Sequence, residues 1–347
     1  MLPLVSIIIP VYNTAKYLKN CLDSVVNQSY SNIEIIVIND CSTDCSQAIM
    51  NHYAQNYHNI KIVDSSLRLL PGGARNIGLE LAQGNYIYFL DSDDFMARDA
   101  ISTLIHLVTV YETPIASGQH QTIIGPLNFH GNNSLKDTFI DLTQNKEMID
   151  ECNGVVWNNL YKHELISNIR FPENLLYEDN AFIYPVFTRA RSWAKTDKIL
   201  YYYRRNLHSI TISSKLFPNE RILDVYSCLE YMYNTCKNIG SYEEFKDIIE
   251  KISQRIAIYP LLECCLWLGI SKVDRNVVLS GLVDYIKEQY GIEDIMQVEY
   301  LMNRVIHSKR LKIKLNLLAK YLEKLSLSYP NGDNLENVRR VLKKYSK

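Results

Sequence analysis

Three carboxylates stand within four residues at Asp91-Ser92-Asp93-Asp94, with no lysine or arginine among them. They follow Tyr86–Leu90, an apolar and aromatic run of strand length. In an open α/β sheet, ligands bind beyond the carboxyl ends of the strands. Asp91 and Asp93 are therefore predicted to share Mg²⁺ or Mn²⁺, which typically binds a few carboxylates and substrate phosphates. The alternative is a polar strand end whose acid caps a helix starting near Ala97.

The elements before this loop alternate between strand and helix. Short apolar runs rich in β-branched residues predict strands at Val5–Pro10, Ile33–Ile38 and Ile60–Val63. Thr14 is placed to cap an amphipathic helix after the first strand, and Ser42–Asp44 to cap a helix after the second. This order predicts a doubly wound α/β domain with right-handed crossovers.

Residues suited to a nucleotide follow each predicted strand. Tyr12 is placed to pack on a base, Asp40 to accept a hydrogen bond from a base imide, and Arg75 to face a diphosphate. Arg75 is predicted to open the helix Asn76–Ala82, where free N–H groups also attract phosphate. The alternative is a plain turn with a surface arginine. No GxGxxG follows the first strand, which disfavours a dinucleotide cofactor.

Composition indicates a folded chain of two domains. Its 347 residues are 47% hydrophobic and 22% charged. The apolar segments at the start and at Ile256–Ile270 are interrupted by proline, which predicts neither a signal peptide nor a spanning helix, and hence a cytoplasmic protein. The eight cysteines lack a paired CxxC framework and are predicted to be reduced thiols. Cys41 and Cys45 have no nearby histidine, so no metal role is expected for them.

Charge is unevenly distributed although the net charge is −1. Residues 1–100 hold 6 Lys and Arg against 10 Asp and Glu, whereas residues 300–347 hold 12 against 3. Basic stretches at Ser308–Lys314 and Arg339–Lys344 suggest peripheral contact with the inner face of the cell membrane or with a polyanionic acceptor. A solvated helical face explains them equally well. No nucleic-acid partner is predicted.

Six motifs, in this order along the chain, resemble those of the family-2 glycosyltransferases, GT-A-fold inverting enzymes that use nucleotide-sugar donors. They are Ser6–Asn13, Ile38–Asp44, Gly73–Gly78, Phe89–Asp94, Trp157–Tyr161 and Tyr177–Asp179. The resemblance covers roughly residues 4 to 213. It implies a Rossmann-like GT-A catalytic domain at 1–215, with a nucleotide-binding half at 1–125 and an acceptor half at 126–215. An α-helical C-terminal domain at 216–347 would follow.

The resemblance also implies roles for individual residues. The nucleotide would contact Pro10, Tyr12, Asn13, Asp40, Arg75, Asp91 and Asp93. Asp93 would be the principal metal ligand, Asp91 would contact the ribose or the metal, and Asp179 in the Glu178–Asp179 pair would be the catalytic base. Two departures affect the donor contacts: Asn39 stands where the family commonly has aspartate, and Ser65–Pro71 lacks the usual Asn-Gly.

The chemistry of Asp179 has an independent rationale. An inverting transfer needs one base, which takes the acceptor hydroxyl proton while that oxygen attacks opposite the leaving diphosphate. A metal ion and Arg75 would stabilise the departing charge in place of an acid. The alternative is that Glu178–Asp179 merely caps the predicted helix Asn180–Thr188.

Trp157 and Asn158 lie between the two acidic clusters and are predicted to form the acceptor floor, unless Trp157 is a core residue. His208 is a candidate metal ligand, although a lone histidine is more often not a ligand. Arg204 and Ser209 are alternative phosphate contacts. Beyond residue 215, helical periodicity predicts helices at Glu220–Lys237, Tyr242–Tyr259, Arg275–Tyr290 and Val298–Leu327, with turns at Gly240, Gly269, Gly291 and Pro330–Gly332. This part is expected to present acceptor-binding surface, form a homo-oligomer or rest on the membrane.

The predicted function is metal-dependent, inverting transfer of one sugar from a UDP-sugar to a hydroxyl of a growing surface glycan or lipid-linked glycan. One alternative is an inactive glycan- or nucleotide-binding subunit of a glycosyltransferase complex. Another is a nucleotidyltransferase that makes the activated sugar and releases pyrophosphate. The acidic pair at Asp179 favours the transferase, because a binding module has no need of a base.

Overall fold

The computed structural model describes residues 2–123, 136–152, 154–206, 219–265, 267, 269–292, 318 and 335–345. The chain divides into two compact units, Met1–Arg205 with Asn234–Phe245, and Asn206–Tyr233 with Lys246–Lys347. The predicted boundaries at 125/126 and 215/216 fall outside the described residues and stay predictions.

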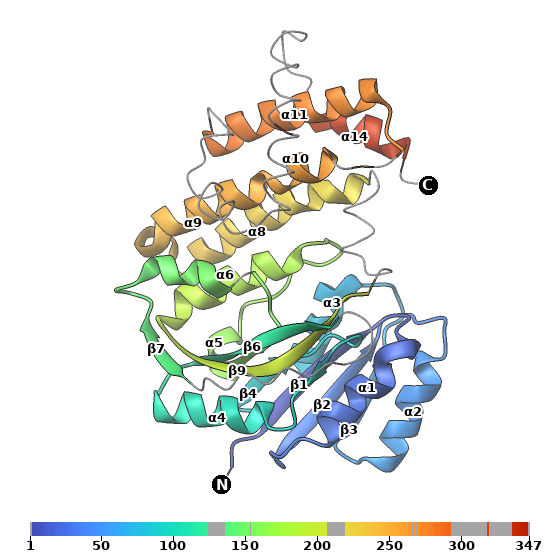
Figure 1. Ribbon diagram of the computed structural model, residues 1–347, viewed down its shortest axis with the longest axis vertical. Coiled ribbons are helices and arrows are strands. Elements are labelled where there is room, and N and C mark those ends of the chain that lie inside the picture. Colours follow the sequence, from blue (N-terminus) through green and yellow to red (C-terminus); the bar gives the residue numbers. More distant parts are fainter. Residues whose placement is uncertain are drawn as a thin grey trace. The chain divides into compact units, whose positions relative to one another are not determined.

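The first unit starts with the predicted alternation of strands and helices. Its elements are β1 (Val5–Val11), α1 (Ala15–Val26), β2 (Ile33–Asn39), α2 (Ser46–Asn56), β3 (Ile60–Asp64), α3 (Leu70–Leu81) and β4 (Tyr86–Phe89). The four strands are parallel in the order β3-β2-β1-β4, and each agrees with its predicted range to within one residue at each end (Figure 1). Because their carboxyl ends meet at one edge, the loops that follow them lie close together.

Both faces of this parallel sheet are covered. On β1, Ile7 and Ile9 pack into a core shared with α1, α2 and α4 (Ala100–Val110), whereas Ile8 faces α3. A Cβ atom on Gly78 of α3 would lie 2.3 Å from Ile8 Cγ2, so glycine permits this close approach. Figure 1 shows α6 (Glu178–Ala190) above the sheet and α4 below it. Burial on both faces explains why β1, β2 and β4 are largely apolar.

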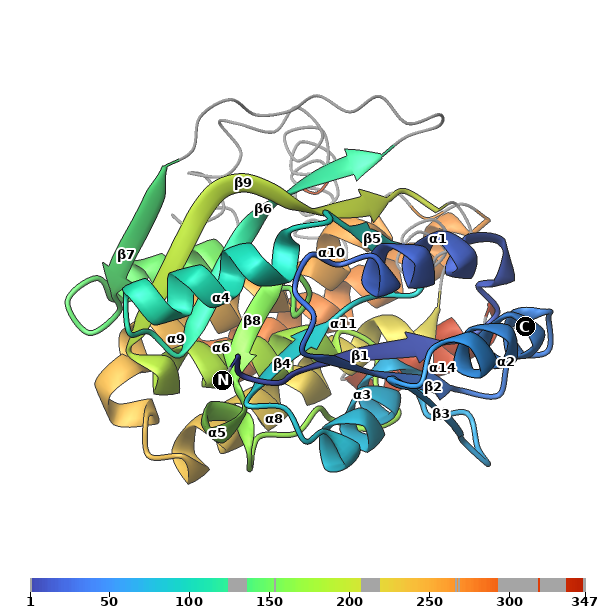
Figure 2. The ribbon, with the colours of Figure 1, turned by 90° about the horizontal axis from the view of Figure 1, so that it is seen from below.

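The sheet continues beyond β4 with strands of mixed direction. The order after β4 is β8 (Asn159–Lys162), β6 (Ile115–Ile123), β9 (Ser192–Arg204) and β5 (Phe95–Met96), and β7 (Asp137–Asp141) also pairs with β9. Figure 2 shows β6 and β9 side by side. The short β5 pairs antiparallel with β9, with Met96 opposite Tyr201. This pairing brings the end of β9 beside the loop that follows β4.

An aromatic cluster fixes the start of α6 over β4. Phe182 of α6 stacks on Phe171 with ring centroids 4.0 Å apart, and both rings meet Phe89 of β4 edge-on. The smaller elements η1 (Lys146–Cys152) and α5 (His163–Ile166) complete the first unit. Phe89 immediately precedes the acidic loop, so the cluster relates the first turn of α6 to that loop.

The described residues after 218 are mostly helical, as predicted. It contains η2 (Glu220–Leu223), α8 (Asp224–Asn238), α9 (Tyr242–Ala257), α10 (Tyr259–Cys264), α11 (Lys272–Tyr290) and α14 (Leu335–Lys343). Gly240, Gly269 and Gly291 have positive φ angles, which confirms three of the predicted turns. The fourth, at Pro330–Gly332, lies outside the described residues. The predicted helix Val298–Leu327 lies outside the described residues except at residue 318.

The C-terminal helix α14 packs against α11. Tyr345 and Lys344, directly after α14, contact Asp274 of α11 at 2.7 and 3.1 Å. The basic residues Arg339 and Arg340 are exposed, whereas Val341 is buried. No helix among the described residues is both long and apolar enough to cross a bilayer. Contact of the basic residues with a membrane stays a prediction.

Candidate active site

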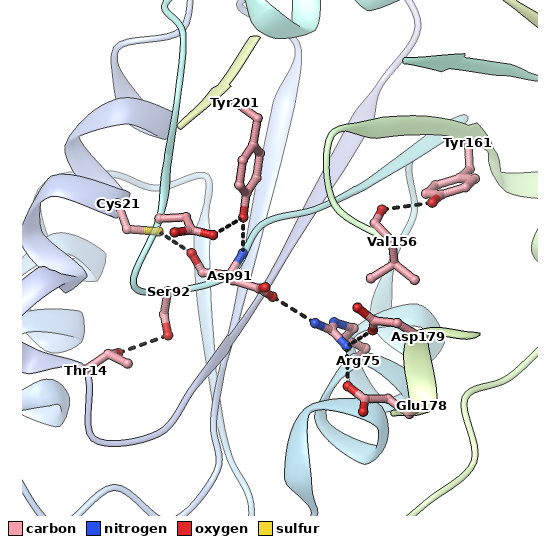
Figure 3. Close-up of polar contacts among 11 residues, drawn as sticks. Thr14, Cys21, Arg75, Asp91, Ser92, Val156, Tyr161, Glu178, Asp179 and Tyr201 are labelled. Atoms are coloured by element: carbon pink, nitrogen blue, oxygen red, sulfur yellow. Dashed lines mark hydrogen bonds and ion pairs between the residues drawn. The ribbon is translucent and has the colours of Figure 1, made fainter. Parts of the chain in front are cut away.

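The acidic loop lies at the carboxyl edge of the parallel strands, and neighbouring elements hold it there (Figure 3). Ser92 Oγ accepts a hydrogen bond from Thr14 Oγ1 at 3.0 Å, and Cys21 Sγ donates to the Asp91 carbonyl at 3.7 Å. Thr14 precedes α1 but its side chain makes no capping bond, because its hydroxyl contacts the acidic loop instead. Thr14 thus occupies the predicted N-cap position of α1, but its side chain contacts the acidic loop and does not cap the helix.

Asp94 anchors the acidic loop to strand β9. Its carboxylate accepts hydrogen bonds from Tyr201 Oη at 2.7 Å and from the Arg204 backbone N–H at 2.6 Å. Arg204 Nε also donates to the Asp93 carbonyl at 3.0 Å. Burial is the main cause that raises the pKa of Asp94 to about 9, and repulsion from Asp93 and Asp91 adds to the rise. Tyr201 was not singled out from the sequence, because only the pairing of β5 with β9 places it here.

Helix α3 begins earlier than predicted. It starts at Leu70 with Pro71 in its first turn, so Arg75 lies inside the helix and not at its start. The pair Gly72-Gly73 lies inside this helix, in the turn before Arg75. A Cβ atom on Gly72 would come within 2.7 Å of the Pro172 carbonyl oxygen, so this glycine serves close packing. The predicted position of Arg75 at a helix N-terminus is therefore wrong, and its contact with a diphosphate stays a prediction.

Arg75 instead meets three carboxylates from two distant segments (Figure 3). Nη2 lies 2.8 Å from Asp91 Oδ1, and Nη1 lies 2.8 Å from both Glu178 Oε1 and Asp179 Oδ1. The Arg75 side chain is 3% exposed, whereas Asp91 and Asp179 keep 27% and 23% of their side-chain surfaces exposed. The structure thus brings Asp91, Glu178 and Asp179 together, and the two aspartates remain reachable from solvent.

The first turn of α6 presents Glu178 and Asp179. The helix begins at Glu178, and the preceding Tyr177 has the left-handed φ of 70°. Neither acid occupies the position of the capping residue, and both side chains turn to Arg75. The capping alternative for this pair is therefore wrong. The side chains of Glu178 and Asp179 form ion pairs with Arg75 instead.

Burial sets the electrostatics of the cluster. It raises the pKa of Glu178 and of Asp179, and Arg75 opposes the rise. Glu178 and Asp91 then add repulsion, and the pKa of Asp179 reaches about 8. Burial lowers the pKa of Arg75, but the three carboxylates outweigh burial and raise it, so the guanidinium stays charged. Asp179 therefore has a pKa in the range that suits a general base near neutral pH.

Tyr12 and Asp40, predicted to bind a base, share a neighbour that the sequence did not suggest. The Arg68 guanidinium lies 3.4 Å from the centroid of the Tyr12 ring and forms an ion pair with Asp40. Asp40 also accepts a hydrogen bond from the Leu69 N–H at 2.6 Å. Tyr12 is 41% exposed and Asp40 is buried. Both lie at the predicted edge, and their contact with a base stays a prediction.

Asn13 joins the loops after β1 and β2. Its side-chain oxygen accepts hydrogen bonds from the N–H groups of Thr43 and Asp44 at 2.7 and 3.3 Å. Its φ of 51° is left-handed, a conformation that asparagine tolerates better than most residues. Pro10, the other predicted base contact, is a partly buried residue of β1. Asn13 thus holds the loop after β1 against the loop after β2. Direct contact of Asn13 or Pro10 with a nucleotide stays a prediction.

Trp157 and Asn158, the predicted acceptor floor, are largely buried. Trp157 is 7% exposed and stacks on Tyr201 and Tyr203 with centroids 4.4 and 5.6 Å apart. Asn158 Nδ2 donates to the Gly118 carbonyl at 2.6 Å. These contacts match the core alternative for Trp157, and acceptor binding stays a prediction. Tyr203, partly exposed beside the acids, is a further aromatic candidate, to which the sequence alone assigned no individual role.

The residues at the loop fit a hard divalent cation. Asp91 and Asp93 are partly exposed and supply oxygen atoms, whereas Asp94 is buried and bonded to β9. Mg²⁺ and Mn²⁺ bind well to one or two carboxylates completed by substrate phosphates. Among the described residues, no group of three or more His, Cys, Asp or Glu is arranged to hold an ion. The predicted ligand His208 lies outside the described residues.

Comparison with known proteins places the chain among glycosyltransferases. A model described as Glycosyl transferase family 2 matches residues 6–170. The uncharacterized glycosyltransferase EpsJ of Bacillus subtilis (strain 168) is 30% identical, over 70% of this chain and 74% of its own length. Glycosyltransferase GlyA of Streptococcus pneumoniae serotype 4 is 33% identical over 58% of this chain, but the match spans 30% of GlyA.

Solved structures show the same architecture. S. aureus TarS 1–349 aligns with a TM-score of 0.66 and 20% identity over 92% of both chains, and its complex with UDP aligns with a TM-score of 0.62 and 19% identity over 98% of this chain and 90% of that one. The likeness confirms the predicted GT-A α/β domain followed by helices. The family model and the long match to EpsJ show that the chain belongs to glycosyl transferase family 2.

Proposed function

We propose that this protein transfers a sugar from a UDP-sugar to a hydroxyl of a glycan or lipid-linked glycan, with inversion at the anomeric carbon. One observation carries the proposal. Asp91, from the loop at the nucleotide edge, and Asp179, from the start of α6, lie 2.8 Å from opposite ends of one guanidinium. A donor-side acid and a candidate base thus face the same centre.

The donor is proposed from the edge residues and from a structural neighbour. Tyr12 offers an exposed ring to a base, and the Asp40 carboxylate suits the imide N–H of uracil once Arg68 moves aside. TarS, which shares the fold, has been solved with UDP. A uridine diphosphate at this edge would extend its phosphates toward Asp91 and Asp93.

Asp179 is proposed as the general base. It would take the proton of the acceptor hydroxyl while that oxygen attacks the anomeric carbon and the nucleotide diphosphate leaves from the opposite face. Its 23% exposure leaves the carboxylate within reach of an acceptor, and its raised pKa gives it affinity for the proton. Asp91 and Asp93 would hold a divalent cation, which would supply positive charge near the leaving phosphates.

The alternative, a subunit that binds a glycan or a nucleotide without activity, is not favoured. A binding module has no use for a carboxylate whose pKa is raised and which remains exposed beside the donor edge. A nucleotidyltransferase would act on a nucleoside triphosphate and release pyrophosphate, and no contact in the described residues favours it.

The test measures UDP release from UDP-glucose, UDP-galactose, UDP-N-acetylglucosamine and UDP-N-acetylgalactosamine with Mn²⁺. Asp179→Asn should lower kcat by about 10²- to 10⁴-fold and leave the Kd for UDP unchanged. Asp137→Asn, at an exposed aspartate of β7, is the matched control and should behave as wild type. Undiminished turnover in Asp179→Asn would refute the assignment of the base.

A further inference from the structure

We propose that Arg75 is a positioning residue that holds the base Asp179 and the donor-side Asp91 in register, and that it does not bind the diphosphate. The inference rests on the proposed function, because it takes Asp179 as the base. It assigns Arg75 a role different from the phosphate contact that its position in the sequence suggested.

The contacts of Arg75 span the site. One terminal nitrogen, Nη2, serves Asp91, and the other, Nη1, serves Glu178 and Asp179, all at 2.8 Å. Because the guanidinium is a rigid planar fork, fixing one end fixes the direction of the other. The position of Asp179 is thereby defined relative to Asp91 although 88 residues separate them in the sequence.

The surroundings of Arg75 leave little room for a ligand. Its side chain is 3% exposed, and its Cζ lies 5.4 Å from the centroid of the Phe171 ring. Both terminal nitrogens already face carboxyl groups, three in all against the one guanidinium. A phosphate would have to displace a carboxylate and then lie beside the others, which repel it.

The residues of α3 next to Arg75 pack closely against the segment that leads into α6. The next residue, Asn76, donates from Nδ2 to the Phe171 carbonyl and accepts from the Phe171 N–H, both at 2.9 Å. A Cβ atom on Gly72, one turn earlier, would lie 2.7 Å from the Pro172 oxygen and 3.1 Å from Glu178 Cγ. Helix α3 thus clamps the segment that leads into α6, and Arg75 sets the direction of its acids.

A lysine cannot replace this arginine. It keeps the charge but offers a single nitrogen on a flexible stem, so it cannot bind at both ends. Arg75→Lys should lower kcat about 100-fold, because a misplacement of about 1 Å at a reacting group costs that much. The Kd for UDP should stay within about threefold of wild type. Arg189→Lys, at the partly exposed arginine near the end of α6, is the matched control.

A double-mutant cycle separates positioning from direct chemistry. Wild type, Arg75→Lys, Asp179→Asn and the double variant are compared by kcat for UDP release and by the Kd for UDP. If Arg75 acts through Asp179, the double variant is at most about threefold slower than Asp179→Asn. The inference would be overturned if the two substitutions lowered kcat by factors that multiply in the double variant. It would also be overturned if Arg75→Lys raised the Kd for UDP tenfold or more. Either result would leave the proposed function intact.

A second variant covers the case in which Arg75→Lys does not fold. Gly72→Ala should push the first turn of α6 away from α3 without removing any charge. It should lower kcat in the wild-type background and have little effect in the Asp179→Asn background. Equal losses in both backgrounds would overturn positioning by α3. If instead Asp179→Asn alone keeps full kcat, the proposed function fails before the inference is reached.

Discussion

Arg75 and Asp179, 104 residues apart in the chain, are joined by an ion pair of 2.8 Å. The same guanidinium reaches Asp91 at the end of β4. This link between α3, α6 and the acidic loop defines the centre at which a donor and an acceptor would meet.

The rate should depend on pH through Asp179. Its pKa is raised to about 8, and a general base works only when deprotonated, so kcat/KM should rise with pH up to about 8 and level off above it. Below pH 7 the rate should fall about tenfold per pH unit. Initial rates between pH 5.5 and 9.5 measure this, with circular dichroism to confirm folding at each pH. A flat profile down to pH 6 would contradict the assignment.

Tyr12 should contribute base stacking. Tyr12→Ala should weaken UDP binding about tenfold or more, since stacking on an aromatic ring is worth about 1–3 kcal/mol per base. Tyr57→Ala is the matched control, because the exposure of Tyr57, 38%, is close to the 41% of Tyr12 and Tyr57 lies directly after α2. Calorimetric titration with UDP and Mn²⁺ compares them. Equal affinities for the two variants would remove Tyr12 from the base site.

Removal of metal should abolish turnover. Treatment with EDTA should lower UDP release by at least about 100-fold, because the leaving diphosphate loses its counter-charge, and Mn²⁺ should restore it. Asp93→Ala should raise the Mn²⁺ concentration needed for half-maximal rate by about tenfold. Asp137→Ala should not change it. Full activity after exhaustive chelation would show that Asp91 and Asp93 serve the donor without a cation.

Tyr201 should stabilise the acidic loop through Asp94. Tyr201→Phe deletes the hydroxyl that donates to the buried carboxylate at 2.7 Å, which should cost about 1–3 kcal/mol of unfolding free energy. Urea denaturation measures the loss, and Tyr57→Phe serves as the exposed control. Stability equal to wild type would mean that Asp94 gains nothing from this hydroxyl.

Patterns local in the sequence determined much of this protein. Runs of β-branched residues and helical spacing predicted β1 to β4 and the alternation with helices, because burial on two faces or on one stripe leaves a direct periodic trace. The acids at the end of β4 could also be recognised, because they directly follow one of these buried runs in the sequence. Six motifs in order also indicated the family, and the comparisons confirmed it.

Tertiary structure alone decided how those residues are used. Gly72 lies inside α3, where the lack of a side chain lets the helix approach the Pro172 carbonyl closely. Arg75 looked like a phosphate ligand, yet its fork is filled by carboxylates that no sequence window contains together. Tyr201 reaches Asp94 only because β5 pairs with β9. Periodicity records how much of an element is buried, whereas the partner of a charged or polar group depends on contacts between segments far apart in the chain.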